Sequence, residues 1–316
     1  MEQNKDNNQP LMVTIRCIAY NQEKYIRDCL EGFVMQKTNF RFEAIVHDDA
    51  STDGTAAIIK EYAEKFPDII KPILETENQY SKHDGSLQKI MDKACNGKYV
   101  AYCEGDDYWI DPLKLQKQVD FMENHPDFSL CGTNGLILWE EQIQRPSYFN
   151  NELQSKEVSF REVISKWYFP TAGLLCRKEV LESYPEWTYK IYSGDLTLVL
   201  MAAYLGKIYY LSDYTCVYRK GLKDSASAIA DKSRLYVVQQ HKFLYSYYVK
   251  YTKGKFEKEV NDILARLNKN ISYLELKSHH YGIAWLKYPM RMFKEEVVRK
   301  IAYIILGREK THLLFH

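Results

Sequence analysis

Short apolar runs alternate with amphipathic stretches over the first third of the chain. The apolar runs are rich in β-branched and aromatic residues, and they predict strands at 11–19, 42–46, 69–74 and 99–103. The stretches between them carry apolar residues at helical spacing and predict helices at 25–35, 55–66 and 86–95. Strands that alternate with helices in this rhythm predict a parallel, Rossmann-like sheet.

The pattern changes in the middle of the chain, where strands and helices no longer alternate regularly. An amphipathic helix is predicted at 112–124 and an apolar strand at 129–139, and a polar stretch follows from 140 to 156. Further on, the pattern predicts an apolar run at 171–176, a helix that opens at 192–195 and ends near 206, and short strands at 208–211 and 215–218. From about Ser225 the chain is rich in Tyr and Lys and is predicted to be helical.

Acidic residues follow two of the predicted strands directly, in segments 48–55 and 104–109. Ligands of open α/β sheets bind beyond the carboxyl ends of the strands, so acids from two strands can converge on one crevice. Clustered carboxylates repel one another, and Mg²⁺ or Mn²⁺ bridging to phosphate oxygens relieves that repulsion. The pattern therefore predicts a nucleotide and metal site; the alternative for Asp106 and Asp107 is a solvated turn.

Two other acids in these regions have a simpler interpretation. Asp53 precedes Gly54-Thr55, and Asp111 precedes Pro112, each where a helix is predicted to begin. Asp before the first helical turn, and Pro within that turn, are typical helix-start signals. We therefore expect Asp53 and Asp111 to cap helices.

Composition narrows the classes of protein that are possible. The chain has 316 residues with 46% apolar content, enough for one large domain or two smaller ones. Its formal net charge of +1 argues against a dedicated nucleic-acid surface, which needs a basic excess. The seven cysteines form no CxxC pair and are expected to be buried in a reducing compartment.

Neither terminus suggests export or membrane insertion. Residues 1–10 are polar and Asn/Gln-rich, and we expect a disordered leader rather than a secretory signal. No stretch reaches the roughly 18 apolar residues that a membrane span requires. The expected location is the cytoplasm, with peripheral contact at the inner face of the membrane as an option for residues 284–306.

Four motifs, taken together, resemble a known family. In chain order they are Tyr20-Asn21, Asp48-Asp49 with 51–55, Gly97-Lys98-Tyr99 before 104–107, and Gly194-Asp195. Over residues 11–220 this order and spacing resembles the family 2 glycosyltransferases of GT-A fold. Segment 104–109, with Asp111-Pro112 and 114–118 after it, is similar to enzymes of bacterial surface-polysaccharide assembly. The resemblance implies an α/β fold with a mixed sheet flanked by helices, of the nucleotide-diphospho-sugar transferase type.

The resemblance also implies an activity and a division of the chain. The family transfers a sugar from a nucleotide-sugar, usually with Mg²⁺ or Mn²⁺, and most members invert the anomeric centre. We expect a catalytic domain at 11–225, with a nucleotide-binding half at 11–110 and an acceptor half at 111–225. A helical extension is expected at 226–316. The expected donor is a UDP-sugar, and the expected acceptor is a hydroxyl of a glycan or lipid-linked oligosaccharide.

Residue roles follow from the resemblance position by position. Ala19 and Tyr20 would flank the nucleobase, and Asp49 would accept a hydrogen bond from a uracil-type imide; a core aromatic is the alternative for Tyr20. Asp106 and Asp107 would match the family's ribose and metal acids. Asp107 is the expected direct metal ligand, which Asp106 joins, and Glu104 supports them at the strand end.

Asp195 is the expected general base, since an inverting displacement needs one carboxylate opposite the leaving group to take the acceptor proton. Helix capping is its alternative role and is compatible with catalysis. Many relatives carry an acidic pair here, whereas this chain has Gly194 before the acid. Trp109 and Trp187 are candidates for stacking on sugars, with a core position as the alternative.

A second departure concerns the residues after Tyr218-Arg219. Relatives often carry a His here that contacts the metal or diphosphate, but this chain continues with Lys220. Arg219, Lys220 or Lys223 would instead pair with the diphosphate. His47 and His83 show no metal-ligand spacing and are expected to be structural or exposed.

The carboxyl-terminal stretch combines aromatic and apolar residues with Lys and Arg over 284–306. Such a basic amphipathic segment can lie at an anionic membrane surface, which would suit a lipid-attached acceptor. The alternative is a helix that packs its apolar face on the rest of the protein. The sequence does not fix the oligomeric state.

Two rival functions remain at this point. A nucleotidyltransferase also uses a metal at strand-end acids, but no Gly-rich, basic loop follows the first strand. A nucleotide- or glycan-binding protein with a degenerate site is suggested by the absent His and the missing second acid. Donor and acceptor choice would depend on the segment 136–166.

Overall fold

The computed structural model describes residues 9–139, 147–222 and 232–277. The chain divides into two compact units, Met1–Ile229 and Ala230–His316. The expected membrane-contact segment 284–306 and Lys223 lie outside the described residues.

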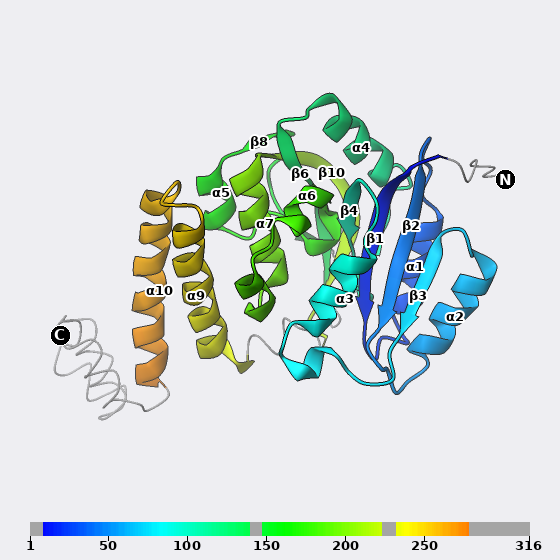
Figure 1. The fold of residues 1–316 in the computed structure, drawn as a ribbon, viewed down its shortest axis with the longest axis horizontal. Helices are drawn as coiled ribbons and strands as arrows, with labels where there is room; N and C mark the ends of the chain where they lie inside the picture. Colours follow the sequence, from blue (N-terminus) through cyan, green and yellow to red (C-terminus); the bar gives the residue numbers. More distant parts are fainter. Residues whose placement is uncertain (1–8, 140–146, 223–231, 278–316) are drawn as a thin grey trace. The chain divides into compact units, whose positions relative to one another are not determined.

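A single mixed sheet forms the centre of the first unit (Figure 1). Its strands lie in the order β3-β2-β1-β4-β9-β6-β10-β5, and β7 and β8 pair with β6 and β10. Their bounds are β1 Leu11–Ala19, β2 Arg41–Asp48, β3 Ile70–Leu74, β4 Tyr99–Tyr102, β5 Tyr108–Trp109, β6 Phe128–Trp139, β7 Ser147–Tyr148, β8 Lys156–Val158, β9 Leu174–Arg177 and β10 Lys207–Lys220.

The direction of the strands divides this sheet into two halves. Strands β3, β2, β1 and β4 run parallel, which confirms the Rossmann-like prediction for the first part of the chain. Strand β9 is antiparallel to both β4 and β6, and β5 is antiparallel to β10. The sheet is therefore mixed, as the family resemblance implies.

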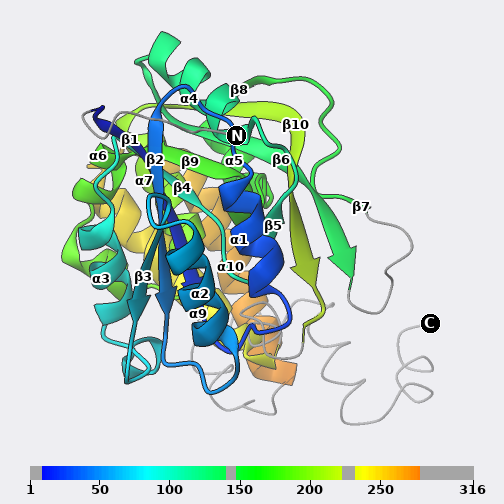
Figure 2. The same cartoon turned by 90° about the vertical axis from the view of Figure 1, so that its right-hand side faces the viewer.

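Helices cover both faces of the parallel half. Helices α1 (Ile26–Val34) and α2 (Thr55–Lys65) pack on the face to which β1 contributes Val13, Ile15 and Cys17. Helix α3 (Ser86–Ala94) packs its apolar side chains on the opposite face of β2 (Figure 2). This two-sided cover explains why the strands are almost continuously apolar. Both α2 and α3 begin where the sequence predicts.

The second half of the first unit contains more short elements than the pattern predicts. Its helices are α4 Lys114–Asn124, α5 Phe160–Ser165, α6 Lys178–Glu182 and α7 Gly194–Leu205, with 3₁₀ turns η2 Thr171–Gly173 and η3 Glu186–Lys190. A further 3₁₀ turn, η1 Tyr80–Lys82, lies in the parallel half between β3 and α3. The strands predicted at 208–211 and 215–218 are one strand, β10, whose pairing register with β6 shifts around Tyr214. The polar residues Ser212 and Asp213 form an irregularity within that strand, not the loop that the pattern suggested.

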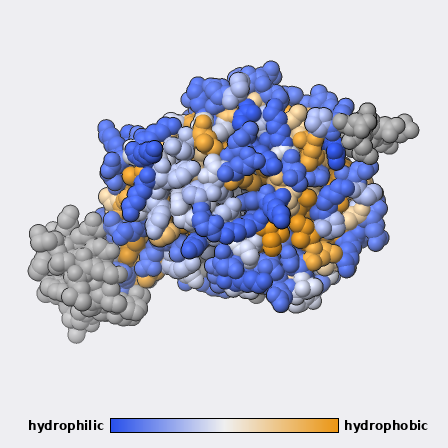
Figure 3. All heavy atoms as spheres, viewed as in Figure 1, coloured by the Kyte–Doolittle hydropathy of each residue, from blue (hydrophilic) through white to orange (hydrophobic). Residues whose placement is uncertain are grey.

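The interior and the surface of the first unit follow the predicted division of apolar and polar residues. All seven cysteines are buried and free, as predicted. Hydrophilic residues predominate on the face shown in Figure 3, and apolar residues form separate groups among them.

The described part of the second unit is a pair of helices, α9 (Arg234–Tyr251) and α10 (Glu257–Lys277), which pack against each other. Lys253 and Gly254, between them, have positive φ angles of 51° and 80°. None of the helices in the described ranges combines the length and apolar character needed to cross a membrane.

Candidate active site

The carboxyl ends of β2, β1 and β4 meet at one edge of the sheet and bring the two acidic segments together. Asp48 pairs with Ala19 at the ends of β2 and β1, and the Asp49 N–H donates to the Ala19 carbonyl oxygen at 2.9 Å. On the other side of β1, the Gly105 N–H donates to the Ile18 carbonyl oxygen at 3.0 Å. Segments 48–55 and 104–109 therefore lie on either side of the end of β1.

Asp53 stabilises the chain at the start of α2, although the N-cap of that helix is Gly54 and Asp53 lies one residue before it. Its Oδ1 accepts from the Thr55 N–H at 3.0 Å at the start of α2, and its Oδ2 accepts from the Glu23 N–H at 3.1 Å. Asp111 is similar, since its Oδ1 accepts from the Leu113 N–H at 2.9 Å just before α4. Both acids stabilise helix starts.

Asp49 holds the segment that follows β3. Its Oδ1 accepts from the Gln79 N–H at 2.7 Å, and its Oδ2 accepts from the Tyr80 N–H at 3.0 Å. The Asp49 side chain is almost fully enclosed, with 1% exposed, and Ala19 is buried beside it, whereas Tyr20 is 47% exposed. The contact of Asp49 with a nucleobase stays a prediction, and the structure gives this acid a structural role as well.

We expect Asp49→Ala to destabilise the protein by at least about 2 kcal/mol, because two buried backbone N–H groups would lose a charged acceptor. Asp84→Ala is the matched control, since exposed Asp84 accepts from one backbone group, the Ser86 N–H at 2.9 Å. Its loss should cost less than about 1 kcal/mol. Urea unfolding measures both, and equal losses for the two variants would contradict the role of Asp49.

Arg219 connects the second acidic segment to β10 and α1. Its backbone N–H donates to Asp107 Oδ1 at 2.9 Å, and its Nη1 donates to the Asp106 carbonyl oxygen at 2.7 Å. Its Nη2 pairs with Asp28 of α1, and its guanidinium lies 4.4 Å from the ring centre of Tyr108. The sequence reading named Arg219 but missed Asp28, because no local pattern relates residues so far apart in the chain.

Burial and mutual repulsion make ionisation of the acids at this edge costly. Burial is the main cause that raises the pKa of Asp107 well above its ordinary value, and the charge of Asp106 adds to it. Burial likewise raises the pKa of Asp106, and that of Glu104 to about 7. The charges of Asp106 and Asp195 both raise the pKa of Glu104, so these acids lie within electrostatic reach of one another.

Asp195 lies in the first turn of α7. Its Oδ1 accepts from the Leu196 N–H at 2.8 Å, and its Oδ2 accepts from the Thr171 hydroxyl at 3.2 Å. Burial raises the pKa of Asp195 above its ordinary value, although these hydrogen bonds favour the charged form. Asp195 thus contributes to the start of α7 and also lies within electrostatic reach of Glu104.

Trp109 has the core position that the sequence left open for it. It is 2% exposed, its Nε1 donates to the Ala172 carbonyl oxygen at 2.8 Å, and Phe33 packs against it edge to face. The Nζ of buried Lys114 lies 4.3 Å from the ring centre. Because no face of the ring is open, we no longer assign Trp109 to sugar stacking. Trp187 is partly buried.

The remaining candidate residues are Lys220, His47 and His83. The Lys220 Nζ lies 4.8 Å from the ring centre of Trp139. His47 is fully buried with its Nε2 3.3 Å from Glu75 Oε1, and burial lowers its pKa. His83 is exposed and has a φ of 52°.

Asp106 and Asp107 are the residues that would hold a divalent metal ion. Among the residues that the structure describes, no three His, Cys, Asp or Glu side chains are arranged as a metal-ligand group. A cation at Asp106 and Asp107 would therefore depend on oxygens from a bound ligand as well. Such a cation fits the chemistry of the pair, because it would relieve the repulsion that raises their pKa values.

The mixed sheet flanked by helices is the GT-A fold, as in the two solved structures that follow. The structure is similar to S. aureus TarS 1–349 in complex with UDP-GlcNAc, with a TM-score of 0.58 and 18% identity, covering 96% of this chain and 84% of the TarS 1–349 chain. It is also similar to the mannosyltransferase PcManGT from Pyrobaculum calidifontis in complex with GDP-Man and Mn²⁺ (TM-score 0.54, 14% identity, 98% of this chain and 89% of PcManGT). These likenesses confirm the predicted GT-A fold.

The chain belongs to glycosyl transferase family 2, whose model matches residues 14–184. It is 34% identical over 230 residues to the uncharacterized protein Rv1520 of Mycobacterium tuberculosis. The aligned region covers 72% of this chain but only 65% of the length of Rv1520. The chain is 32% identical over 117 residues to the Escherichia coli UDP-Glc:alpha-D-GlcNAc-diphosphoundecaprenol beta-1,3-glucosyltransferase WfaP, covering 37% of this chain and 43% of WfaP. The family resemblance noted in the sequence is thereby confirmed.

Proposed function

We propose that this protein is an inverting glycosyltransferase that moves a sugar from a UDP-sugar to a hydroxyl of a glycan or lipid-linked acceptor in polysaccharide biosynthesis. The observation that carries the proposal is that the acidic segments 48–55 and 104–109 lie on either side of the carboxyl end of β1. Family membership and the GT-A fold support it. The name of WfaP, which states a UDP-glucose donor and a diphosphoundecaprenol-linked acceptor, supports the substrate classes.

The nucleotide would bind where β1 ends. Exposed Tyr20 would offer a ring to the base, and buried Ala19 and Asp49 would flank the base on the protein side. Asp106 would contact the ribose and share the metal with Asp107. When bound, Mg²⁺ or Mn²⁺ neutralises the charge that develops on the departing diphosphate.

Asp195 would act on the acceptor. The acceptor oxygen attacks the anomeric carbon, its proton passes to a carboxylate oxygen of Asp195, and the bond from that carbon to the diphosphate breaks with its electron pair on the leaving oxygen. The Thr171 hydroxyl, which donates to Asp195 Oδ2, would orient the carboxylate. The raised pKa of Asp195 suits a base, because it makes the carboxylate a better proton acceptor.

Thermal shifts with UDP, GDP, CDP and dTDP, each with and without Mn²⁺, test the nucleotide site. Ligand that binds the native state raises apparent stability by mass action. We expect a shift for UDP that increases with Mn²⁺. Absence of a shift for every nucleotide would contradict the proposal, and a preference for GDP would overturn only the choice of donor.

Arg219 would leave Asp28 and pair with the diphosphate. Substitutions of Arg219 and of Asp28 should therefore change the affinity for UDP in opposite directions. Arg219→Met should weaken UDP binding by about tenfold or more, because charge-assisted hydrogen bonds contribute about 1.5–3 kcal/mol. Uridine binding should change little. Asp28→Asn should instead strengthen UDP binding by up to about threefold, since the exposed Asp28 carboxylate competes with the diphosphate for the largely buried Arg219 guanidinium. Calorimetric titrations measure both, and weaker UDP binding by Asp28→Asn would contradict this competition.

A further inference from the structure

An aromatic run, Trp167-Tyr168-Phe169, lies between α5 and η2 and shows two kinds of environment. Tyr168 and Phe169 are each only 4% exposed, whereas Trp167 is 45% exposed. Among the described residues, the Trp167 indole has neither a hydrogen-bond partner nor a ring neighbour. A large aromatic surface is thus left open to solvent within an otherwise buried run.

The buried neighbours fix the chain on which Trp167 stands. The Asn150 Nδ2 donates to the Tyr168 carbonyl oxygen at 3.2 Å, and the Tyr168 ring packs edge to face on Tyr210 at 5.5 Å. The Phe169 ring lies so close to Gly132 that a Cβ atom there would collide with it. Because the following residues are held in the core, the exposed position of Trp167 is set by packing and not by a loose loop.

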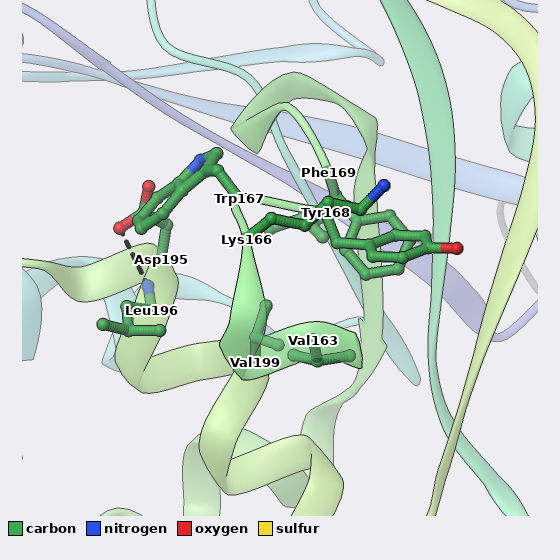
Figure 4. A pocket seen from close by; sticks show the side chains of 9 residues that line it. Val163, Lys166, Trp167, Tyr168, Phe169, Asp195, Leu196 and Val199 are labelled. Atoms are coloured by element: carbon green, nitrogen blue, oxygen red, sulfur yellow. Dashed lines mark hydrogen bonds between the residues drawn. The ribbon is translucent and has the colours of Figure 1, made fainter. Parts of the chain in front are cut away.

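Trp167 and Asp195 line the same pocket. Val163, Leu196 and Val199 form much of its apolar wall. Figure 4 shows the Trp167 indole beside the Asp195 carboxylate. The cavity holds about 20 Å³, room for about one water molecule. A sugar ring would therefore lie over the pocket on the indole, not inside it.

We propose that Trp167 is the platform on which the acceptor sugar stacks, a role that rests on the proposed function. One face of a pyranose ring presents C–H groups, which cover an aromatic ring and remove its surface from water. The hydroxyls at the edge of that sugar then reach toward Asp195, which is the group that takes the proton. The ligand class is a pyranoside with an apolar face, and Trp167 selects and positions it.

Within the described ranges, the other exposed aromatic side chains do not line the pocket of Asp195. Tyr148 is paired with Tyr214, with ring centres 5.0 Å apart. Trp139 lies under Lys220, and Tyr20 stands at the end of β1 with the nucleotide segment. None of these three lines the pocket of Asp195.

The test compares Trp167→Ala and Trp167→Phe with the exposed control Tyr148→Ala. The probes are the methyl β-glycosides of glucose, galactose and N-acetylglucosamine, added to protein with UDP and Mn²⁺, and saturation-transfer NMR gives their dissociation constants. We expect the wild type to bind at least one glycoside through its ring protons. Trp167→Ala should raise that dissociation constant about tenfold, Trp167→Phe less, and Tyr148→Ala not at all.

The thermal shift with UDP and Mn²⁺, measured on the same samples, separates this proposal from the proposed function. An unchanged UDP shift with weakened glycoside binding in Trp167→Ala supports the platform. Equal glycoside binding by wild type and Trp167→Ala overturns it, as does a wild type that binds UDP but none of the glycosides. A wild type that binds neither UDP nor glycoside overturns the proposed function and, with it, the platform.

Discussion

Asp195→Asn is expected to lower the rate of sugar transfer by about 10²–10⁴-fold, the usual contribution of a positioned general base. The amide oxygen of Asn can still accept from the Leu196 N–H, and the amide NH2 can donate to the Thr171 hydroxyl oxygen in place of the second bond, so the start of α7 should remain folded. Its oxygen cannot take the acceptor proton at useful rates. The measurement is the release of UDP from a UDP-sugar in the presence of an acceptor glycoside.

The pH profile gives an independent view of the same residue. Burial raises the folded pKa of Asp195 above 3.8, so the base is lost by protonation as the pH falls through that raised value. The wild-type rate should fall on the acid side, and the residual rate of Asp195→Asn should lack that limb. Asp120→Asn, at an exposed position of α4, is the control and should behave as wild type. A wild-type rate in Asp195→Asn would remove this acid from the mechanism.

Asp107→Asn is expected to have opposite effects on stability and on ligand binding. Ionising Asp107 in the folded protein is costly, because burial and the Asp106 charge raise its pKa. A group with a raised folded pKa destabilises the native state above its ordinary pKa, so removing the charge should raise the melting temperature at pH 7. The amide oxygen can still accept from the Arg219 N–H.

The same substitution should abolish the part of the UDP shift that depends on Mn²⁺ and reduce turnover by about 10²–10³-fold, a typical loss for one electrostatic group. Asp111→Asn is the matched control, since Asp111 binds Lys117 Nζ at 2.8 Å and lies outside the proposed metal pair. That variant should keep the full shift. A Mn²⁺-dependent shift that persists in Asp107→Asn would exclude Asp107 as the metal ligand.

The parallel half of the fold could be predicted because its signals are local. Strands β1, β2 and β4 are almost entirely buried, and polar or acidic residues follow each of them closely, so β1 and α2 begin where the pattern places them. The second half was harder, since β5 and β7 have two residues each and depend on pairing with distant strands. Helix α5 did carry a signal: Ser159 and Glu162 form a capping box within the polar region.

The sequence indicated which residues belong to the candidate site, but it did not indicate which of them contact one another. The acids of 104–109 and Asp195 could be named from their positions after strands or before a helix. The link from Arg219 to Asp28 joins β10 to α1, and only the folded sheet brings them together. Trp109 was misread as a possible sugar contact because its burial under α1 depends on tertiary packing. Trp167 was not singled out from the sequence, because an aromatic run normally predicts core.

The release of UDP from UDP-sugars tests the central claim most directly. UDP-glucose, UDP-galactose and UDP-N-acetylglucosamine are each incubated with the protein, Mn²⁺ and the methyl β-glycosides. The account predicts that at least one donor releases UDP faster with a glycoside than without, with a glycoside product one sugar heavier. Binding of UDP with Mn²⁺ but no release from any donor would contradict it and identify a nucleotide-binding protein without transferase activity.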